Sequence, residues 1–166
     1  NFRPPSAGMP ADEVLAAELK AAQQRVVDAN EKDKKNDPLP TMEDIKAPYG
    51  ASYRNMMREV EDTFANYESL FPELKGKKLE VAGSVWFQGV NDMFGDVAPG
   101  DYASNMKHFI NDVRKDFGNQ QLPFVIAAIG NNGSKPASGG MLTVQTAQLS
   151  MNDVPEFKGN VKAFPT

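Results

Sequence analysis

The stretch that most constrains this chain is residues 79–92, LEVAGSVWFQGVND. A mainly apolar run with small residues inside it passes directly into a turn of glycine, amide and carboxylate residues. Such a run predicts a strand that is covered on both faces, as in a parallel sheet. Ligands of open α/β sheets bind beyond the carboxyl ends of the strands. We therefore expect the chemistry of this protein at residues 88–92.

The rest of the chain alternates between helical and strand patterns. Apolar residues at helical spacing predict helices over 11–30, 52–71, 101–117 and 138–151, and shorter apolar runs predict strands over 121–130 and 160–164. This order predicts βαβ units with right-handed crossovers, and hence an α/β fold. We expect a three-layer α/β/α sandwich with a mainly parallel sheet.

Two connecting regions stand out beside these elements. Residues 31–50 carry alternating charges followed by prolines, which predicts a surface insertion with a short helical turn at 42–45. A connection of this length can also be functional or mobile. The strand over 121–130 leads into the polar residues 131–133, at the edge of the sheet where a ligand cleft is expected.

Composition argues against several classes of function. The chain has 166 residues, which suits one domain, and a formal net charge of −4 without a basic stripe, which argues against binding to nucleic acid. It has no cysteine, so disulfides and thiolate metal sites are excluded. No segment has the ~20 apolar residues that a membrane-spanning helix needs. The only histidine, His108, lies beside apolar residues of a predicted helix and is expected at the surface or half-buried.

Residues 86–92, WFQGVND, are similar to a known signature. They resemble the W-x-Q-G-x-x-[ND] string of the sialate O-acetylesterase-like carbohydrate esterases, a branch of the SGNH hydrolase superfamily. Residues 89–92 within them match the G-x-N-D block of that superfamily. The similarity continues through residues 102–106, 112–117 and 122–126, and Gln145 and Gln148 resemble the glutamine-bearing helix that follows in the family.

The resemblance implies roles for three residues in ester hydrolysis, which needs a nucleophile, a base and donors for the oxyanion. Asn91 occupies the asparagine of G-x-N-D and is the expected amide donor. Gly89 lets backbone approach the substrate without a Cβ in the way, and Gln88 orients the site or donates a hydrogen bond. The alternative is a strand-ending turn that is stabilised by its own hydrogen bonds.

The same resemblance suggests residues that contact the substrate. The segment FRPPSAG near the N-terminus is similar to one near the active-site rim of the family, so Arg3 could bind an anionic or hydroxyl-rich substrate. A structural salt bridge is the alternative for this arginine. Trp86 and Asp92 belong to the signature and are further candidates for substrate binding, although Asp92 could instead tie down the turn.

Two parts of the family's machinery have no counterpart in the chain. The family's nucleophile lies in a G-Q-S-N string and its base in a D-x-x-H string, and neither string occurs. At Val90 many relatives carry glutamate, which leaves finer substrate assignments open. We expect residues 1–166 to be the middle and C-terminal part of one SGNH-type (flavodoxin-like) domain, inactive without the missing N- and C-terminal parts of the same polypeptide. No nucleophile context surrounds Ser6, Ser84, Ser134 or Ser138.

The expected function is that of a carbohydrate O-acetylesterase, which removes acetyl groups from sugar hydroxyls. By resemblance the reaction proceeds through a serine acyl-enzyme and uses no metal or organic cofactor. The expected partner is an acetylated carbohydrate, with neither nucleic acid nor membrane involved, and the resemblance favours a secreted or periplasmic location. The alternative is a non-catalytic module, in which the fold is retained for binding or for structure.

Overall fold

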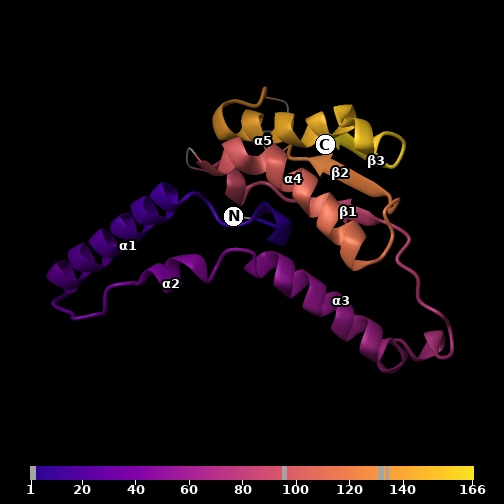
Figure 1. Ribbon diagram of the computed structural model, residues 1–166, viewed down its shortest axis with the longest axis horizontal. Helices are drawn as coiled ribbons and strands as arrows, with labels where there is room; N and C mark the ends of the chain where they lie inside the picture. The colour runs from indigo at the N-terminus through magenta and orange to yellow at the C-terminus, as the bar shows by residue number, and fades with distance from the viewer. Residues whose placement is uncertain (1–2, 95–96, 131–132, 134) are drawn as a thin grey trace.

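The computed structural model describes residues 3–94, 97–130, 133 and 135–166 (Figure 1). Its helices are α1 (Asp12–Asp33), α2 (Met42–Lys46), α3 (Ala51–Leu70), α4 (Val97–Asp116) and α5 (Gly139–Leu149). Its strands are β1 (Ser84–Trp86), β2 (Phe124–Ala128) and β3 (Val161–Pro165). Short 3-10 helices include η1 (Pro5–Ala7) and η3 (Asn91–Met93). The order of the longer helices and the strands is the one that the sequence predicts.

The three strands form one parallel sheet in the order β1-β2-β3. Trp86 pairs with Ile126, and Phe124 pairs with Val161. α4 connects β1 to β2 and α5 connects β2 to β3, and right-handed crossovers between neighbouring strands place both helices on the same face. The two helices pack against each other there (Figure 1). The predicted α/β class and the parallel sheet are confirmed.

The hydrophobic core fills the space between this face of the sheet and the two helices. β2 contributes Phe124, Ile126 and Ala128, at every second position, as the two-residue period of a strand requires. Each large apolar side chain that is fully buried stabilises the fold by about 1.5–3 kcal/mol. The apolar stripe predicted for 101–117 is confirmed, although the helix begins earlier, at Val97. Its buried members are Tyr102, Met106, Phe109, Ile110 and Val113.

The opposite face of the sheet is open. Val85 is 76% exposed, Phe87 is 71% exposed and Val125 is 38% exposed. The prediction that residues 79–87 form a strand covered on both faces is therefore wrong, because β1 spans only Ser84–Trp86 and both crossover helices lie on the other face. An apolar run cannot by itself distinguish a covered strand from an edge strand with one bare face. A second layer of helices stays a prediction.

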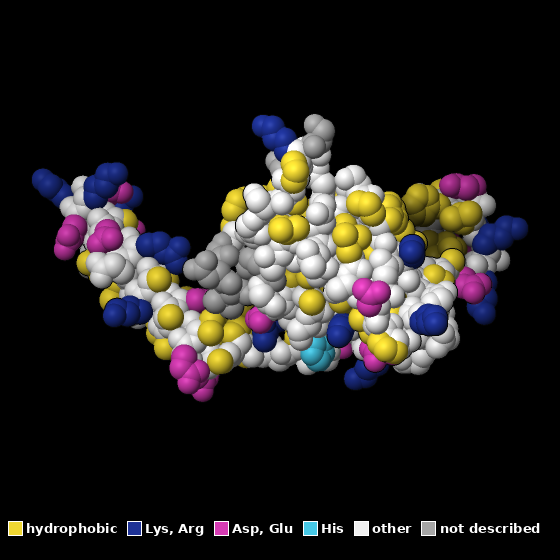
Figure 2. All heavy atoms as spheres, turned by 90° about the horizontal axis from the view of Figure 1, so that it is seen from above, with side chains coloured by type: hydrophobic (Ala, Val, Ile, Leu, Met, Phe, Trp, Pro, Cys, Tyr) yellow, Lys and Arg dark blue, Asp and Glu magenta, His cyan; other side chains and the backbone are white. Residues whose placement is uncertain are grey.

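Helices α1, α2 and α3 run along one side of the molecule and extend beyond the sheet (Figure 1). α1 buries Leu15 alone, and α3 buries Tyr53, which packs edge-on against Phe109 and donates a 2.7 Å hydrogen bond to Asp116. Figure 2 shows charged side chains gathered most densely at the two ends of the elongated molecule. In the described ranges every helix is too short or too polar to cross a membrane.

Residues 31–50 run from the end of α1 to the start of α3. Asn30 and the backbone of Asp37 exchange two hydrogen bonds of 2.9 Å. The helical turn predicted at 42–45 is present as α2, which begins with a capping box between Thr41 and Asp44. Such a box satisfies the first backbone N–H groups of a helix. Most of the segment is exposed, and its status as an insertion stays a prediction.

Candidate functional site

The turn that follows β1 contains the residues that the sequence singles out. Gly89 in this turn is buried and has a φ of 148°, a conformation that side chains rarely adopt. A Cβ at this position would come within 2.9 Å of the side chains of Ile129 and Val144. Only glycine fits, and the turn lies directly against the residue after β2 and against helix α5.

Asn91 begins η3, beyond the carboxyl end of β1, and it is exposed. Within the residues that the structure describes, no group forms a hydrogen bond with its side-chain amide. The backbone around it is held in place, since the N–H of Asp92 donates to the carbonyl of Gly89 over 3.1 Å. The side-chain amide of Asn91 is therefore available to bind a ligand, and the backbone of the turn that carries it is fixed by a hydrogen bond.

Gln88 and Asp92 are joined inside the turn. The Gln88 Nε2 donates to the Asp92 Oδ2 over 2.5 Å. Asp92 is only 2% exposed, so its carboxylate lies beneath the turn rather than on it. In this position the carboxylate fixes the Gln88 side chain and ties the two ends of the turn together.

A buried tyrosine on α4 forms the next layer. The Tyr102 hydroxyl donates to the Gln88 carbonyl over 2.9 Å and lies 3.2 Å from the Gln88 Oε1. It accepts hydrogen bonds from the Trp86 Nε1 over 3.2 Å and the Gln148 Nε2 over 3.0 Å. Burial raises the pKa of Tyr102 to about 12, against the smaller lowering effect of the hydrogen bonds from Trp86 and Gln148. The hydroxyl therefore stays neutral and able to donate at neutral pH.

Gln148 on α5 links this turn to the second strand. It is fully buried, and its Nε2 donates to the Gln88 carbonyl over 2.6 Å, while its Oε1 accepts from the Ile129 N–H over 2.9 Å. The sequence pattern does not reveal the role of Tyr102, which reads as one member of an apolar stripe. A signal for Gln148 exists, because Gln148 resembles a glutamine of the family's helix that follows the second strand.

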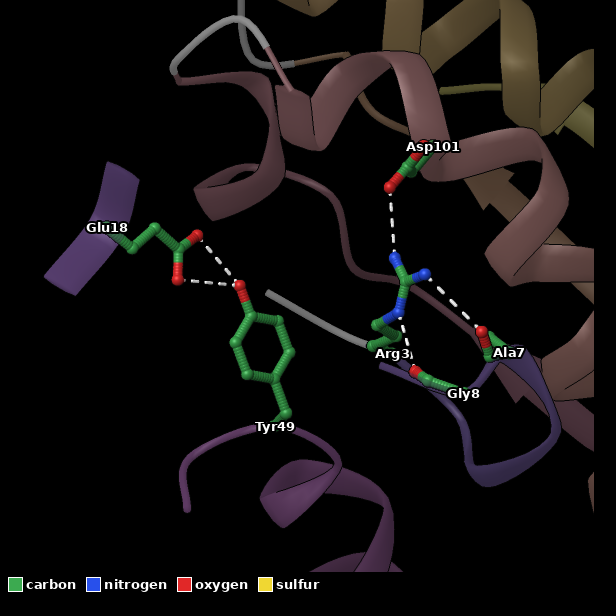
Figure 3. Close-up of polar contacts among 6 residues, drawn as sticks. All are labelled: Arg3, Ala7, Gly8, Glu18, Tyr49 and Asp101. Carbon is green, nitrogen blue, oxygen red and sulfur yellow. Dashed lines mark hydrogen bonds and ion pairs between the residues drawn. The ribbon is translucent and has the colours of Figure 1, made fainter. Parts of the chain in front are cut away.

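Arg3 is engaged on three sides (Figure 3). Its Nη1 donates to the Asp101 Oδ2 over 2.9 Å, its Nε to the Gly8 carbonyl over 2.8 Å, and its Nη2 to the Ala7 carbonyl over 3.3 Å. Its side chain is 13% exposed. The structural ion pair that was the alternative for this residue is thus present.

Arg3 and Trp86 border the same small cavity. It has a volume of about 220 Å³, and its other walls include Tyr53, Met56 and Phe109. Trp86 is half-buried, and its ring packs against that of Phe109 with centroids 4.2 Å apart. Because its indole N–H also donates to Tyr102, one wall of the cavity is connected to the Gln88 turn.

A serine, a histidine and an aspartate meet where η1 packs against α4. The Ser6 Oγ lies 2.8 Å from the His108 Nδ1, and the Ser6 backbone N–H donates to the Asp112 Oδ2 over 2.9 Å. In a catalytic triad the carboxylate orients the imidazole. Here the recorded partner of Asp112 is the backbone of Ser6, and His108 is half-buried, as expected. These contacts dock the N-terminal segment on α4.

The remaining candidates form no further centre. Ser84 begins β1, and Ser138 precedes the first residue of α5. Asn131, Asn132 and Ser134 lie outside the described residues. Across the ranges that are described, no three His, Asp or Glu side chains come together in a way that could hold a metal ion.

The Tyr102 hydroxyl supports a prediction about stability. Tyr102→Phe is expected to lower the free energy of unfolding at pH 7 by about 1–3 kcal/mol, because buried donors lose their acceptor. The folded-state pKa of about 12 lies above the ordinary 10.0, so this stabilisation is complete below pH 10 and is lost as the pH rises through 12. Urea unfolding of both proteins from pH 7 to 11.5 should show the gap between them narrowing above pH 10. A gap that is constant over this range would contradict the prediction.

A protein-family comparison bears on the whole site. The model of the family described as "Carbohydrate esterase, sialic acid-specific acetylesterase" matches residues 41–163, which include β1, the Gln88 turn, α4 and α5. No curated protein and no solved structure is significantly similar to the chain. The resemblance carried by residues 86–92 is confirmed by this match. The chain therefore belongs to the carbohydrate esterase family of sialic acid-specific acetylesterases.

Proposed function

We propose that this chain is part of a serine carbohydrate O-acetylesterase and that residues 88–92 supply part of its oxyanion site. Family membership supports carbohydrate ester hydrolysis at the level of the class. The observation that carries the finer assignment is the exposed Asn91 amide, which has no hydrogen-bond partner among the described residues and follows the carboxyl end of β1. Ligands bind at this edge in open α/β sheets.

The chemistry assigns each residue a distinct task. The serine hydroxyl oxygen attacks the acetyl carbonyl carbon while the histidine takes the hydroxyl proton, and the C=O electron pair moves to the carbonyl oxygen, where negative charge develops. Asn91 Nδ2 and the backbone N–H of Gly89 would donate to this oxygen, and one such donor is worth roughly 10²–10³ in rate. The intermediate collapses by breaking the bond to the sugar oxygen, which takes the proton from the histidine, and water then hydrolyses the acetyl-enzyme to acetate and free serine. Asp92 holds Gln88, and thereby the turn, in place throughout.

The serine and the histidine of this proposal come from segments outside the chain. The bare face of the sheet supports the idea, because parallel sheets occur almost only with both faces covered. β1 is also an edge strand, with β2 as its only recorded neighbour among the described strands. A complete three-layer domain of the SGNH type would place another strand beside β1 and helices over Val85 and Phe87.

Arg3 and Trp86 are the candidates for contact with the sugar. Both residues line the cavity of about 220 Å³, so an aromatic and a cationic residue border the same space. A carboxylate on an acidic sugar would compete with Asp101 for the Arg3 Nη1.

The test compares the complete polypeptide with the 166-residue chain, using acetate release from O-acetylated sialic acid. The complete polypeptide should hydrolyse the ester, and the 166-residue chain should not. Alanine at the serine of the G-Q-S-N string is the control that should abolish release. If the 166-residue chain is active, the nucleophile lies within it, and Ser6→Ala then tests the Ser6–His108 pair. A complete polypeptide that lacks both strings and releases no acetate would favour the non-catalytic module.

A further inference from the structure

We infer that Gln148 is a positioning residue of the oxyanion site, and that it acts by fixing the direction of the Gly89 N–H. The inference rests on the proposed function, since it concerns the same turn. Gln148 does not touch the position that the substrate would occupy. It is fully buried on α5 and reaches the turn from below, at the carbonyl of Gln88.

The carbonyl of Gln88 belongs to the same peptide group as the N–H of Gly89. A peptide group is planar and trans, so its C=O and N–H point in opposite directions. The Gln148 Nε2 at 2.6 Å and the Tyr102 hydroxyl at 2.9 Å hold this carbonyl toward the helical layer. The Gly89 N–H must therefore point away from α4 and α5, and hydrogen bonds to the carbonyl also make that N–H a better donor.

The Gly89 N–H has no acceptor among the described residues, although Gly89 itself is buried. Buried backbone N–H groups without a partner are rare in native proteins. A donor that is aimed by its own peptide group, and left without an acceptor, has the properties required for binding an oxyanion. This observation is independent of the exposure of Asn91.

One face of α5 carries the contacts that hold the turn. Gly140, Val144 and Gln148 are spaced four residues apart and therefore share a face of the helix. A Cβ at Gly140 would lie 1.8 Å from the carbonyl oxygen of Met93, at the end of η3. Val144 lies against Gly89, and Gln148 binds Gln88. The helix thus supports the turn along its whole length, from residue 88 to residue 93.

Gln148 is also fixed at its other end. Its Oε1 accepts from the N–H of Ile129, so the amide cannot rotate without losing a hydrogen bond to the residue that follows β2. Both N–H groups and the oxygen of the side-chain amide are then engaged. Because hydrogen bonds are directional, this arrangement sets the orientation of the Gln88 carbonyl more tightly than an apolar contact could.

The test uses the complete polypeptide with Gln148→Met, which keeps a similar volume and removes the amide. We expect kcat for acetate release to fall about tenfold or more with KM changed less than twofold, since a misdirected donor weakens binding of the transition state alone. The matched control is Gln145→Met, on the same helix. Gln145 donates to the carbonyl of Ile129 over 2.9 Å and makes no recorded contact with the turn, so kcat should be retained.

If Gln148 has a purely structural role, Gln148→Met and Gln145→Met should both have lower melting temperatures, and the two folded variants should have the same kcat. That result would overturn the inference. If Gln148→Met does not fold, Tyr102→Phe removes the other hydrogen bond to the same carbonyl, and an unchanged kcat there overturns it equally. Asn91→Ala separates this inference from the proposed function. If Asn91→Ala is impaired and Gln148→Met is not, only the inference fails. If Asn91→Ala has full activity, the oxyanion assignment of the turn fails first.

Discussion

Replacing Asn91 with alanine in the complete polypeptide is expected to lower kcat for acetate release about a hundredfold or more. The loss of one oxyanion donor costs roughly 10²–10³ in rate. Asn91 is exposed, and its amide has no recorded partner within the described part of the chain, so the substitution should leave the fold intact. Steady-state kinetics with an O-acetylated sialic acid measure the rate, and the melting temperature reports on the fold.

The matched control for this substitution is Asn66→Ala. Asn66 is also exposed, but it lies on α3 and donates to the Asp62 carbonyl of the same helix over 2.8 Å. It should retain full activity. If Asn91→Ala has the wild-type kcat, Asn91 is not an oxyanion donor. That result would favour the alternative that residues 88–92 are a strand-ending turn stabilised by its own hydrogen bonds, and the family assignment would not change.

The second large effect is expected at Gly140, where α5 passes under the site. Gly140→Ala places a Cβ 1.8 Å from the Met93 carbonyl oxygen, and this contact with backbone cannot be relieved by rotating a side chain. Overpacking usually costs 1–3 kcal/mol, and we expect about 3 kcal/mol here, measured by urea unfolding. Because η3 must move, activity of the complete polypeptide should fall as well.

Gly100→Ala is the control, and it is expected to change the free energy of unfolding in the opposite direction. Gly100 lies in the first turns of α4, and no heavy atom of the described residues is within 4 Å of the position of an added Cβ. Alanine in a helix is favoured over glycine by roughly 0.5–1 kcal/mol, so this variant should be more stable than wild type. If Gly140→Ala and Gly100→Ala are destabilised equally, the close contact between residue 140 and the Met93 carbonyl is not the cause of the lost stability.

The sequence predicted those parts of the structure that follow from local pattern. The stripe from Tyr102 to Val113 repeats every three or four residues, and this period is sufficient to place a helix against a sheet. The bare face beside Val85 could not be predicted, because an apolar run does not say which neighbours cover it. Tertiary arrangement decides that, and in this chain both crossovers fall on one side of the sheet.

The candidate site also contains residues that the sequence predicts and contacts that only the structure reveals. A short motif is sufficient to single out Gln88, Gly89 and Asn91 as candidates, because all three lie in one turn. Gln148 acts on Gln88 across 60 residues of sequence, and its contact exists only once β2 and α5 are in place. The ion-pair partner of Arg3 likewise could not be predicted, because Asp101 lies 98 residues away in the sequence and accepts from Arg3 only once η1 packs near the start of α4.

The bare face of the sheet has a consequence for the behaviour of this chain in solution. Exposed Val85 and Phe87 flank a strand edge that has no recorded partner among the described strands. Such an edge can pair with a strand of another chain, and burial of the adjacent apolar side chains would stabilise that pairing. Copies of the 166-residue chain should therefore self-associate as the protein concentration rises. Any segment that covers this surface would also prevent that self-association.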